Sequence, residues 1–116
     1  MRKAGDNEAG FEVAFDAATR TVRVDAWGFW GVGVAPRFRD TVLDACRGRN
    51  SATRLYMEMM RLKPLREEGE EAWLDILTKA PNEGIEAIVV STNSLTKLQL
   101  LRLARQSASK NIVQFQ

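Results

Sequence analysis

The chain has 116 residues, of which 45% are hydrophobic and 28% are charged, with 17 Lys and Arg against 15 Asp and Glu. This length and composition are typical of a single soluble globular domain with one core. The sequence has no His and one Cys, Cys46, which excludes Ser-His and Cys-His catalysis, His-metal sites and an intramolecular disulfide.

The N-terminal residues are small, polar and charged, and we expect residues 1–10 to form a flexible lead-in to one domain over residues 11–116. They contain no apolar run, which argues against a signal peptide. The longest unbroken apolar stretch, residues 87–90, is far shorter than the roughly 20 residues that a membrane span requires. We therefore expect a cytoplasmic protein without a membrane span.

The first half of the chain predicts a hairpin, an irregular segment and a helix. Apolar and polar side chains alternate over residues 11–16 and 21–25, which predicts a β-hairpin with one buried face. Residues 27–34 (WGFWGVGV) place three glycines among large apolar side chains, which predicts a loop or bulge. A helix is predicted to begin near Pro36 and to be closed by Gly48.

The second half predicts two further helices between strands. Residues 53–60 form a mostly apolar run of strand length, and a second helix is predicted over residues 64–79. β-Branched side chains crowd residues 85–90 without alternation, which predicts a buried strand. Asn93 or Ser94 is expected to cap a third helix. The leucines expected on the buried face of that helix are Leu95, Leu98, Leu101 and Leu103. A last short strand is predicted at the C-terminus, formed by Ile112, Val113 and Phe115.

The predicted order is therefore β-β-α-β-α-β-α-β. Strands separated by helices become parallel neighbours joined by right-handed crossovers, while the opening hairpin supplies an antiparallel pair. We expect one small α/β domain with about three helices and a mixed, mostly parallel sheet.

Three stretches of sequence carry a resemblance to a known family. Residues 35–43 (APRFRDTVL) are similar to a first helix that often opens with a small residue and a proline. Residues 57–62 (MEMMRL) are similar to a strand that usually reads leucine, aspartate, leucine, serine, glycine, valine. Residues 63–74 fall on a loop and helix that usually read aspartate, serine, serine or threonine, glycine, leucine, and Gly69 matches that glycine. Over roughly residues 11–115 the chain thus resembles the STAS domain family, named for sulfate transporters and anti-sigma-factor antagonists.

The chain departs from this family at the motif that signalling members use as a switch. In those members a partner kinase phosphorylates a serine or threonine of the motif, whereas this chain has Arg66, Glu67 and Glu68 there and no hydroxyl. One interpretation is that acids in a first helical turn stabilise the helix, by about 0.3–1 kcal/mol each. The other is that Glu67 and Glu68 place fixed negative charge where relatives carry a phosphate, as a partial mimic.

The aromatic segment Trp27, Phe29 and Trp30 also has two interpretations. At least one indole can belong to the core at the margin of the sheet, or the segment can be an exposed loop that anchors a partner or covers a small ligand. Gly31 and Gly33 do not continue into a dinucleotide-binding pattern, and no P-loop sequence is present.

Acidic and basic residues are unevenly distributed along the chain, although the net charge is small. Residues 66–75 contain five acids and one Arg, whereas four cations and no acid follow Glu86. Arg102 and Arg105 share a helix face, which predicts either a solvated face or contact with an acidic protein surface. The cations are few and lack interleaved aromatics, so nucleic acid is not expected. Cys46 is expected to be a buried small hydrophobe.

Two functional hypotheses follow, and neither includes a catalytic residue, a metal or a cofactor. The first is a non-enzymatic interaction module that binds a regulatory kinase or a sigma-factor regulator without a phosphorylation switch. Its predicted contact residues are Lys63, Arg66, Glu67, Glu68 and Trp30. The alternative is binding of a small hydrophobic ligand or lipid, because some relatives of this fold have open hydrophobic pockets. Its predicted residues are Trp27, Phe29 and Trp30. A homodimer stays open under both hypotheses.

Overall fold

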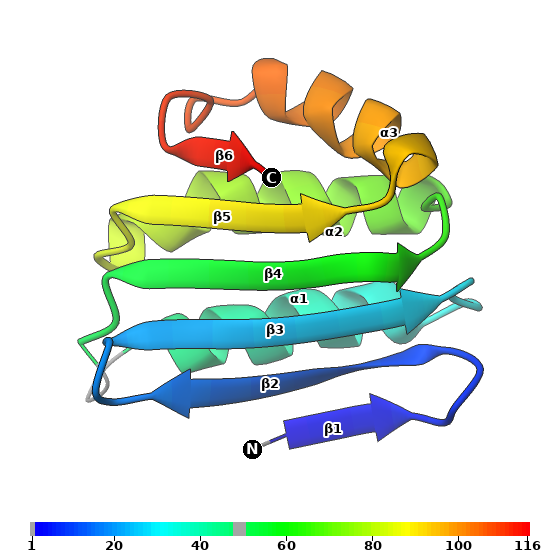
Figure 1. Cartoon of the computed structure of the whole chain (residues 1–116), viewed down its shortest axis with the longest axis horizontal. Helices are drawn as coiled ribbons and strands as arrows, with labels where there is room; N and C mark the ends of the chain where they lie inside the picture. The colour runs from blue at the N-terminus through cyan, green and yellow to red at the C-terminus, as the bar shows by residue number, and fades with distance from the viewer. Residues whose placement is uncertain (1, 48–50) are drawn as a thin grey trace.

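In the computed structural model, residues 2–47 and 51–116 are described. They form one six-stranded sheet with the strand order β1-β2-β3-β4-β5-β6 (Figure 1). Its strands are β1 (Arg2–Gly5), β2 (Gly10–Asp16), β3 (Thr21–Gly28), β4 (Arg54–Leu62), β5 (Ala87–Thr92) and β6 (Val113–Phe115). The helices of these residues are α1 (Val34–Cys46), α2 (Glu67–Lys79), the short 3-10 helix η2 (Ala80–Glu83) and α3 (Ser94–Arg105). The predicted α/β domain with an antiparallel start and a parallel remainder is confirmed.

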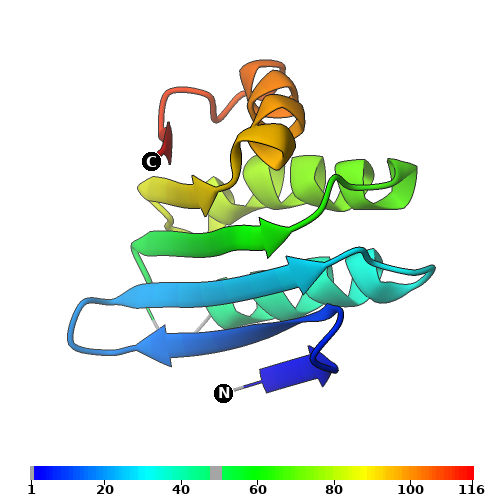
Figure 2. The same cartoon turned by 45° about the vertical axis from the view of Figure 1, so that its right-hand side comes forward.

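The strand order determines where the helices lie. From β3 to β6 each parallel strand pairs with the next one in the chain. Right-handed crossovers that always advance in the same direction place their helices on one face of the sheet. Figures 1 and 2 show α1 and α2 behind the same face, with α3 beside α2 near β6. In the part of the chain that the structure describes, no helix covers the opposite face, and the outward side chains of β4 are polar or exposed, as with Arg54, Tyr56 and Glu58.

The N-terminal segment differs from the prediction of a flexible lead-in over residues 1–10. Residues 2–5 form β1, which pairs antiparallel with β2. The turn that follows is closed by the Asp6 carboxylate, which accepts hydrogen bonds from the backbone N–H groups of Glu8 (2.9 Å) and Ala9 (3.1 Å). These bonds lower the pKa of Asp6. The prediction was wrong because a short edge strand is held by backbone hydrogen bonds, which need no apolar pattern in the sequence.

The start of α2 also differs from the prediction. The helix begins at Glu67 rather than at Pro64. The side chain of Gln99 holds Leu65 outside the helix, because its oxygen accepts from the Leu65 N–H (2.6 Å) and its amide donates to the Leu65 carbonyl (2.7 Å). At the end of α1, the predicted stop at Gly48 lies outside the described residues.

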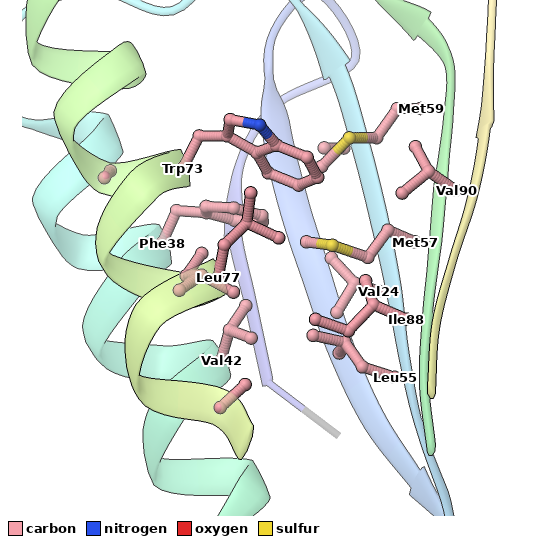
Figure 3. Packing of buried hydrophobic residues seen from close by; sticks show 14 of the residues in the cluster. Val24, Phe38, Val42, Leu55, Met57, Met59, Trp73, Leu77, Ile88 and Val90 are labelled. Atoms are coloured by element: carbon pink, nitrogen blue, oxygen red, sulfur yellow. The ribbon is translucent and has the colours of Figure 1, made fainter. Parts of the chain in front are cut away.

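The core lies between the sheet and the helices on its covered face. In Figure 3 side chains of α1 and α2 point toward those of β3, β4 and β5. The labelled members are Val24, Phe38, Val42, Leu55, Met57, Met59, Trp73, Leu77, Ile88 and Val90. Gly69 of α2 is buried, and a Cβ there would come within 2.9 Å of the Leu65 Cβ. The group that packs closely against Gly69 is therefore the side chain of Leu65 in the same chain.

The third helix begins as predicted but is rotated differently. The Asn93 side chain caps it by accepting from the Thr96 N–H at 2.9 Å. Leu95 and Leu98, predicted to face inward, are 65% and 69% exposed. The buried residues of α3 are Thr96, Leu100, Leu103 and Ala104. The Thr96 hydroxyl donates to the Leu62 carbonyl at 2.6 Å, so a polar contact with β4 decides the rotation.

Candidate functional site

The carboxyl ends of the parallel strands β3, β4 and β5 lie at the same end of the sheet. The segments that follow them, residues 29–33, 63–66 and 93, therefore lie near one another. Ligands of open α/β sheets usually bind where the strand order reverses. Here the order from β3 to β6 never reverses, so the sheet forms no crevice of that kind. This end of the molecule therefore presents an exposed surface rather than a crevice between strands.

The two tryptophans of the aromatic segment are both buried, and Trp30 belongs to the core between the sheet and the helices. Strand β3 continues through Gly28, so Trp27 lies in the sheet, and Trp27 and Trp30 are each 6% exposed. The Trp30 indole N–H donates to the Gly10 carbonyl at 3.1 Å. The centre of its ring lies 4.8 Å from the centre of the Phe38 ring. Neither indole is available to a partner in this structure.

The exposed part of this segment is Phe29 and Val32. Their exposed fractions are 55% and 82%. The guanidinium of Arg66 lies 5.9 Å from the centre of the Phe29 ring, which is within the range of a cation–π contact. The loop after β3 therefore presents two apolar side chains next to the start of α2.

Glu68 fixes this loop to α2. Its carboxylate accepts a hydrogen bond from the Gly33 N–H at 2.7 Å, and Gly33 is the residue that precedes the first turn of α1. Gly33 has a φ of 88°, in the left-handed region that favours glycine. Glu68 thus has a structural role at the N-terminus of α1, while Glu67 beside it is exposed.

The predicted contact residues are only partly brought together at the surface. Arg66, Glu67 and Glu68 line an open hollow of about 300 Å³ that also includes Val32. The Lys63 side chain is exposed, and its backbone N–H donates to the Gly28 carbonyl at 3.0 Å, which joins the ends of β3 and β4. Trp30 lies beneath this surface. We refer below to the exposed group as the carboxyl-end surface, formed by Phe29, Val32, Lys63, Arg66 and Glu67.

Sequence reasoning missed how the exposed apolar side chains are distributed. Among the described residues all five exposed large hydrophobic side chains follow, or lie close to, the carboxyl ends of β3, β4 and β5. They are Phe29, Val32, Met60, Leu95 and Leu98. Helical periodicity alone did not separate the outward leucines of α3 from the inward ones, because both occur at helical spacing.

Replacing Glu68 by alanine is expected to lower the free energy of unfolding by about 1–2 kcal/mol. The change removes a charge-assisted hydrogen bond to a backbone N–H that then has no side-chain partner. Urea unfolding measures the loss, and hydrogen exchange should show faster exchange at Gly33 and in the first turn of α1. Glu67→Ala is the matched control, with a loss of about 0.5 kcal/mol from the helix dipole alone. Equal effects of the two changes would contradict the role assigned to Glu68.

The structure provides little room for a small molecule beneath the aromatic segment. The hollow between Trp30, Leu65 and Gly69 measures about 10 Å³. This is about the least space that one water molecule occupies. Trp30 lines this hollow, whereas Trp27 lines a separate open hollow with Glu12 and Arg61. Both indole N–H groups already donate to backbone carbonyls.

The cysteine and the possible metal ligands among the described residues supply no reactive or metal-binding site. Cys46 is buried, which raises the pKa of its thiol to about 12, so the thiol is protonated and unreactive at neutral pH. No group of three or more His, Cys, Asp or Glu within residues 2–47 and 51–116 could hold a metal ion. Over the same residues, no helix is both long and apolar enough to cross a membrane.

Comparison with known proteins gives no relative that could assign a function to this surface. No protein-family model matches the chain, and no curated protein matches it. The resemblance to the STAS family therefore rests on the quoted stretches of sequence, and its functional content enters below only as a proposal.

Proposed function

We propose that the chain is a non-enzymatic protein-interaction module of the STAS type, which binds a regulatory protein through its carboxyl-end surface. The observation that carries this proposal is the exposure of Phe29 and Val32, at 55% and 82%, on a loop that is fixed at both ends. Exposed apolar side chains with a rim of charged ones are typical of protein interfaces. Lys63, Arg66 and Glu67 supply that rim.

The fixed loop favours binding because little conformational entropy remains to be lost. Trp30 anchors the loop to Gly10 of β2, and Glu68 of α2 anchors it through Gly33. Rigid contact groups lose less entropy on association than mobile ones, which leaves more of the contact energy as affinity. The two exposed side chains are therefore suited to act as anchors in a partner's pockets.

The proposed partner is a regulatory kinase or a sigma-factor regulator, bound without a phosphorylation switch. The motif positions Arg66, Glu67 and Glu68 carry no hydroxyl, so the charge at the start of α2 is permanent. Regulated phosphate on Ser91, Thr92 or Ser94 would contradict a constitutive binder. Incubation with the cognate kinase followed by mass spectrometry tests this point.

The double change Phe29→Glu and Val32→Glu is expected to reduce partner capture at least about tenfold, because it replaces the apolar anchors by charges that must be desolvated. The tagged chain is used for affinity capture from its source cells, and captured proteins are quantified by mass spectrometry. Arg37→Glu, an exposed change on α1, is the matched control and should capture the wild-type set.

Two results would overturn the proposed function. One is unchanged capture by the double variant. The other is a stoichiometric small molecule that native mass spectrometry detects in the wild-type protein and that Trp30→Ala removes. The second result would instead support the hydrophobic-ligand hypothesis.

A further inference from the structure

The outer side of α3 carries a row of four side chains that the core does not use. Leu95, Leu98, Arg102 and Arg105 follow the spacing i, i+3, i+7, i+10, which places them along one side of a helix. Leu95 and Leu98 are 65% and 69% exposed. Both arginines are also exposed. We name this row the α3 stripe.

The exposure of these leucines is enforced by contacts on the opposite side of the helix. The Thr96 hydroxyl is bonded to the Leu62 carbonyl, and the Trp73 indole N–H donates to the Leu100 carbonyl at 3.2 Å. Rotating α3 to bury Leu95 and Leu98 would break the Thr96 contact and expose Leu100 and the residues beside it. The apolar half of the α3 stripe is thus a fixed feature of the surface.

The other half of the α3 stripe carries positive charge that the chain only partly balances. Arg102 pairs with Glu70 at 3.0 Å, and its side chain remains 60% exposed. Arg105 has no ion pair within the described residues. No acidic residue follows Glu86 in the sequence. An acidic partner is therefore the complementary one.

We propose that the α3 stripe docks an acidic amphipathic helix of a partner protein. Apolar side chains of that helix would cover Leu95 and Leu98, and its carboxylates would face Arg102 and Arg105. A row at spacings of three and four fits the groove between equivalent rows of a second helix. This surface uses none of the residues of the carboxyl-end surface, so the inference does not rest on the function proposed above.

A second copy of the chain is a poorer match than an acidic helix. Pairing of two α3 helices places arginines against arginines or against leucines, and neither pairing supplies carboxylates. The acidic helix of the chain is α2, but its apolar side chains are buried in the core. They are Ala72, Trp73, Ile76 and Leu77.

Site-specific photo-crosslinking tests the inference in the full chain. A benzophenone side chain replaces Leu98, and the control places it at Thr78, an exposed position on α2. After irradiation in the source cells, the expected result is a crosslinked partner peptide that is rich in Asp and Glu and has apolar residues at spacings of three and four. Arg102→Glu with Arg105→Glu should reduce the crosslink yield about tenfold, because it places like charges opposite the acids.

Matched variants distinguish binding at the α3 stripe from binding at the carboxyl-end surface and from loss of folding. Arg37→Glu on α1 and Val32→Glu on the carboxyl-end surface should leave the Leu98 crosslink unchanged, and circular dichroism should show native folding for each variant. If Phe29 and Val32 variants capture partners normally while the Leu98 crosslink persists, only the proposed function fails. If capture depends on Phe29 and Val32 while Leu98 gives no crosslink above the Thr78 control, only the α3 inference fails.

Three further results would overturn the docking of an acidic helix. The first is a Leu98 crosslink to a second copy of the chain. The second is flotation of the protein with vesicles of phosphatidylcholine and phosphatidylglycerol that is lost on Leu98→Glu. The third is a crosslinked partner segment without excess acidic residues.

Discussion

Replacing Trp73 by alanine is expected to lower the free energy of unfolding by about 3–5 kcal/mol, the range for removing a large aromatic side chain from a core. Trp73 is 1% exposed and is the largest fully buried side chain among the described residues. It lies on α2 and points toward Met57 and Met59 of β4 (Figure 3), and its indole N–H binds the Leu100 carbonyl of α3 at 3.2 Å. The change therefore weakens the contact of two helices with the sheet. Domains of this size are stable by about 5–15 kcal/mol, so the variant should be close to its unfolding threshold.

Urea unfolding followed by circular dichroism measures this effect. Trp73→Phe keeps most of the packing and loses the hydrogen bond to Leu100, so its expected loss is smaller, about 1–2 kcal/mol. Phe29→Ala truncates an aromatic side chain that is 55% exposed, and its expected loss is below about 0.5 kcal/mol. If Phe29→Ala and Trp73→Ala destabilised the protein equally, the division of the aromatic residues into core and surface would be wrong.

Replacing Gly28 by alanine is expected to cost at least about 2 kcal/mol of unfolding free energy. Gly28 has a φ of +80°, a conformation that costs a residue with a side chain about 1–2 kcal/mol. A Cβ there would come within 2.0 Å of the Glu8 carbonyl oxygen and 2.7 Å of the Ala9 Cα. Both atoms belong to the backbone of the turn between β1 and β2, so this turn must shift to accept the methyl group.

Gly31→Ala is the matched control in the same segment. No heavy atom lies within 4 Å of a Cβ at Gly31, so the expected change is within about 0.5 kcal/mol, or a small gain from a less flexible unfolded chain. Because the Gly28 carbonyl accepts from the Lys63 N–H, Gly28→Ala should also disturb the carboxyl-end surface, visible as faster hydrogen exchange at residue 63. Equal stability of the two variants would contradict the close approach at Gly28.

The features predicted correctly from the sequence are those with local causes. The alternation over residues 11–16 and 21–25 predicts a hairpin, because successive side chains of a strand point to opposite faces. The Asn93 cap is local too, since its side chain binds a backbone N–H three residues later. β1 was missed because it is held to β2 by backbone hydrogen bonds, which leave no pattern in the sequence. The register shift of β3 lies between Asp25 and Trp27, just before the segment that was expected to be irregular.

The candidate site was predicted less completely, for reasons of tertiary contact. The acids near the start of α2 were identified as candidates, although the helix was predicted to begin at Pro64. The bond from Glu68 to Gly33 was not predicted, because it joins residues 35 positions apart. Which aromatic of the segment faces solvent depends on packing of Trp30 against Phe11 and Phe38, from β2 and α1. No pattern within residues 27–34 distinguishes Phe29 from Trp30.

By itself the sequence determined the class of fold, the order of the strands and α-helices after β1, the absence of His chemistry and the lack of a hydroxyl at residues 66–68. These properties follow from residue identity and from periodicity along the chain. Only the tertiary structure decided that both indoles are buried, that Glu68 holds the loop and that α3 turns Leu95 and Leu98 outward. The physical reason is that each outcome depends on hydrogen bonds and packing between elements distant in sequence. The acidic and basic segments seen in the sequence form α2 and α3, which the ion pair of Glu70 with Arg102 joins.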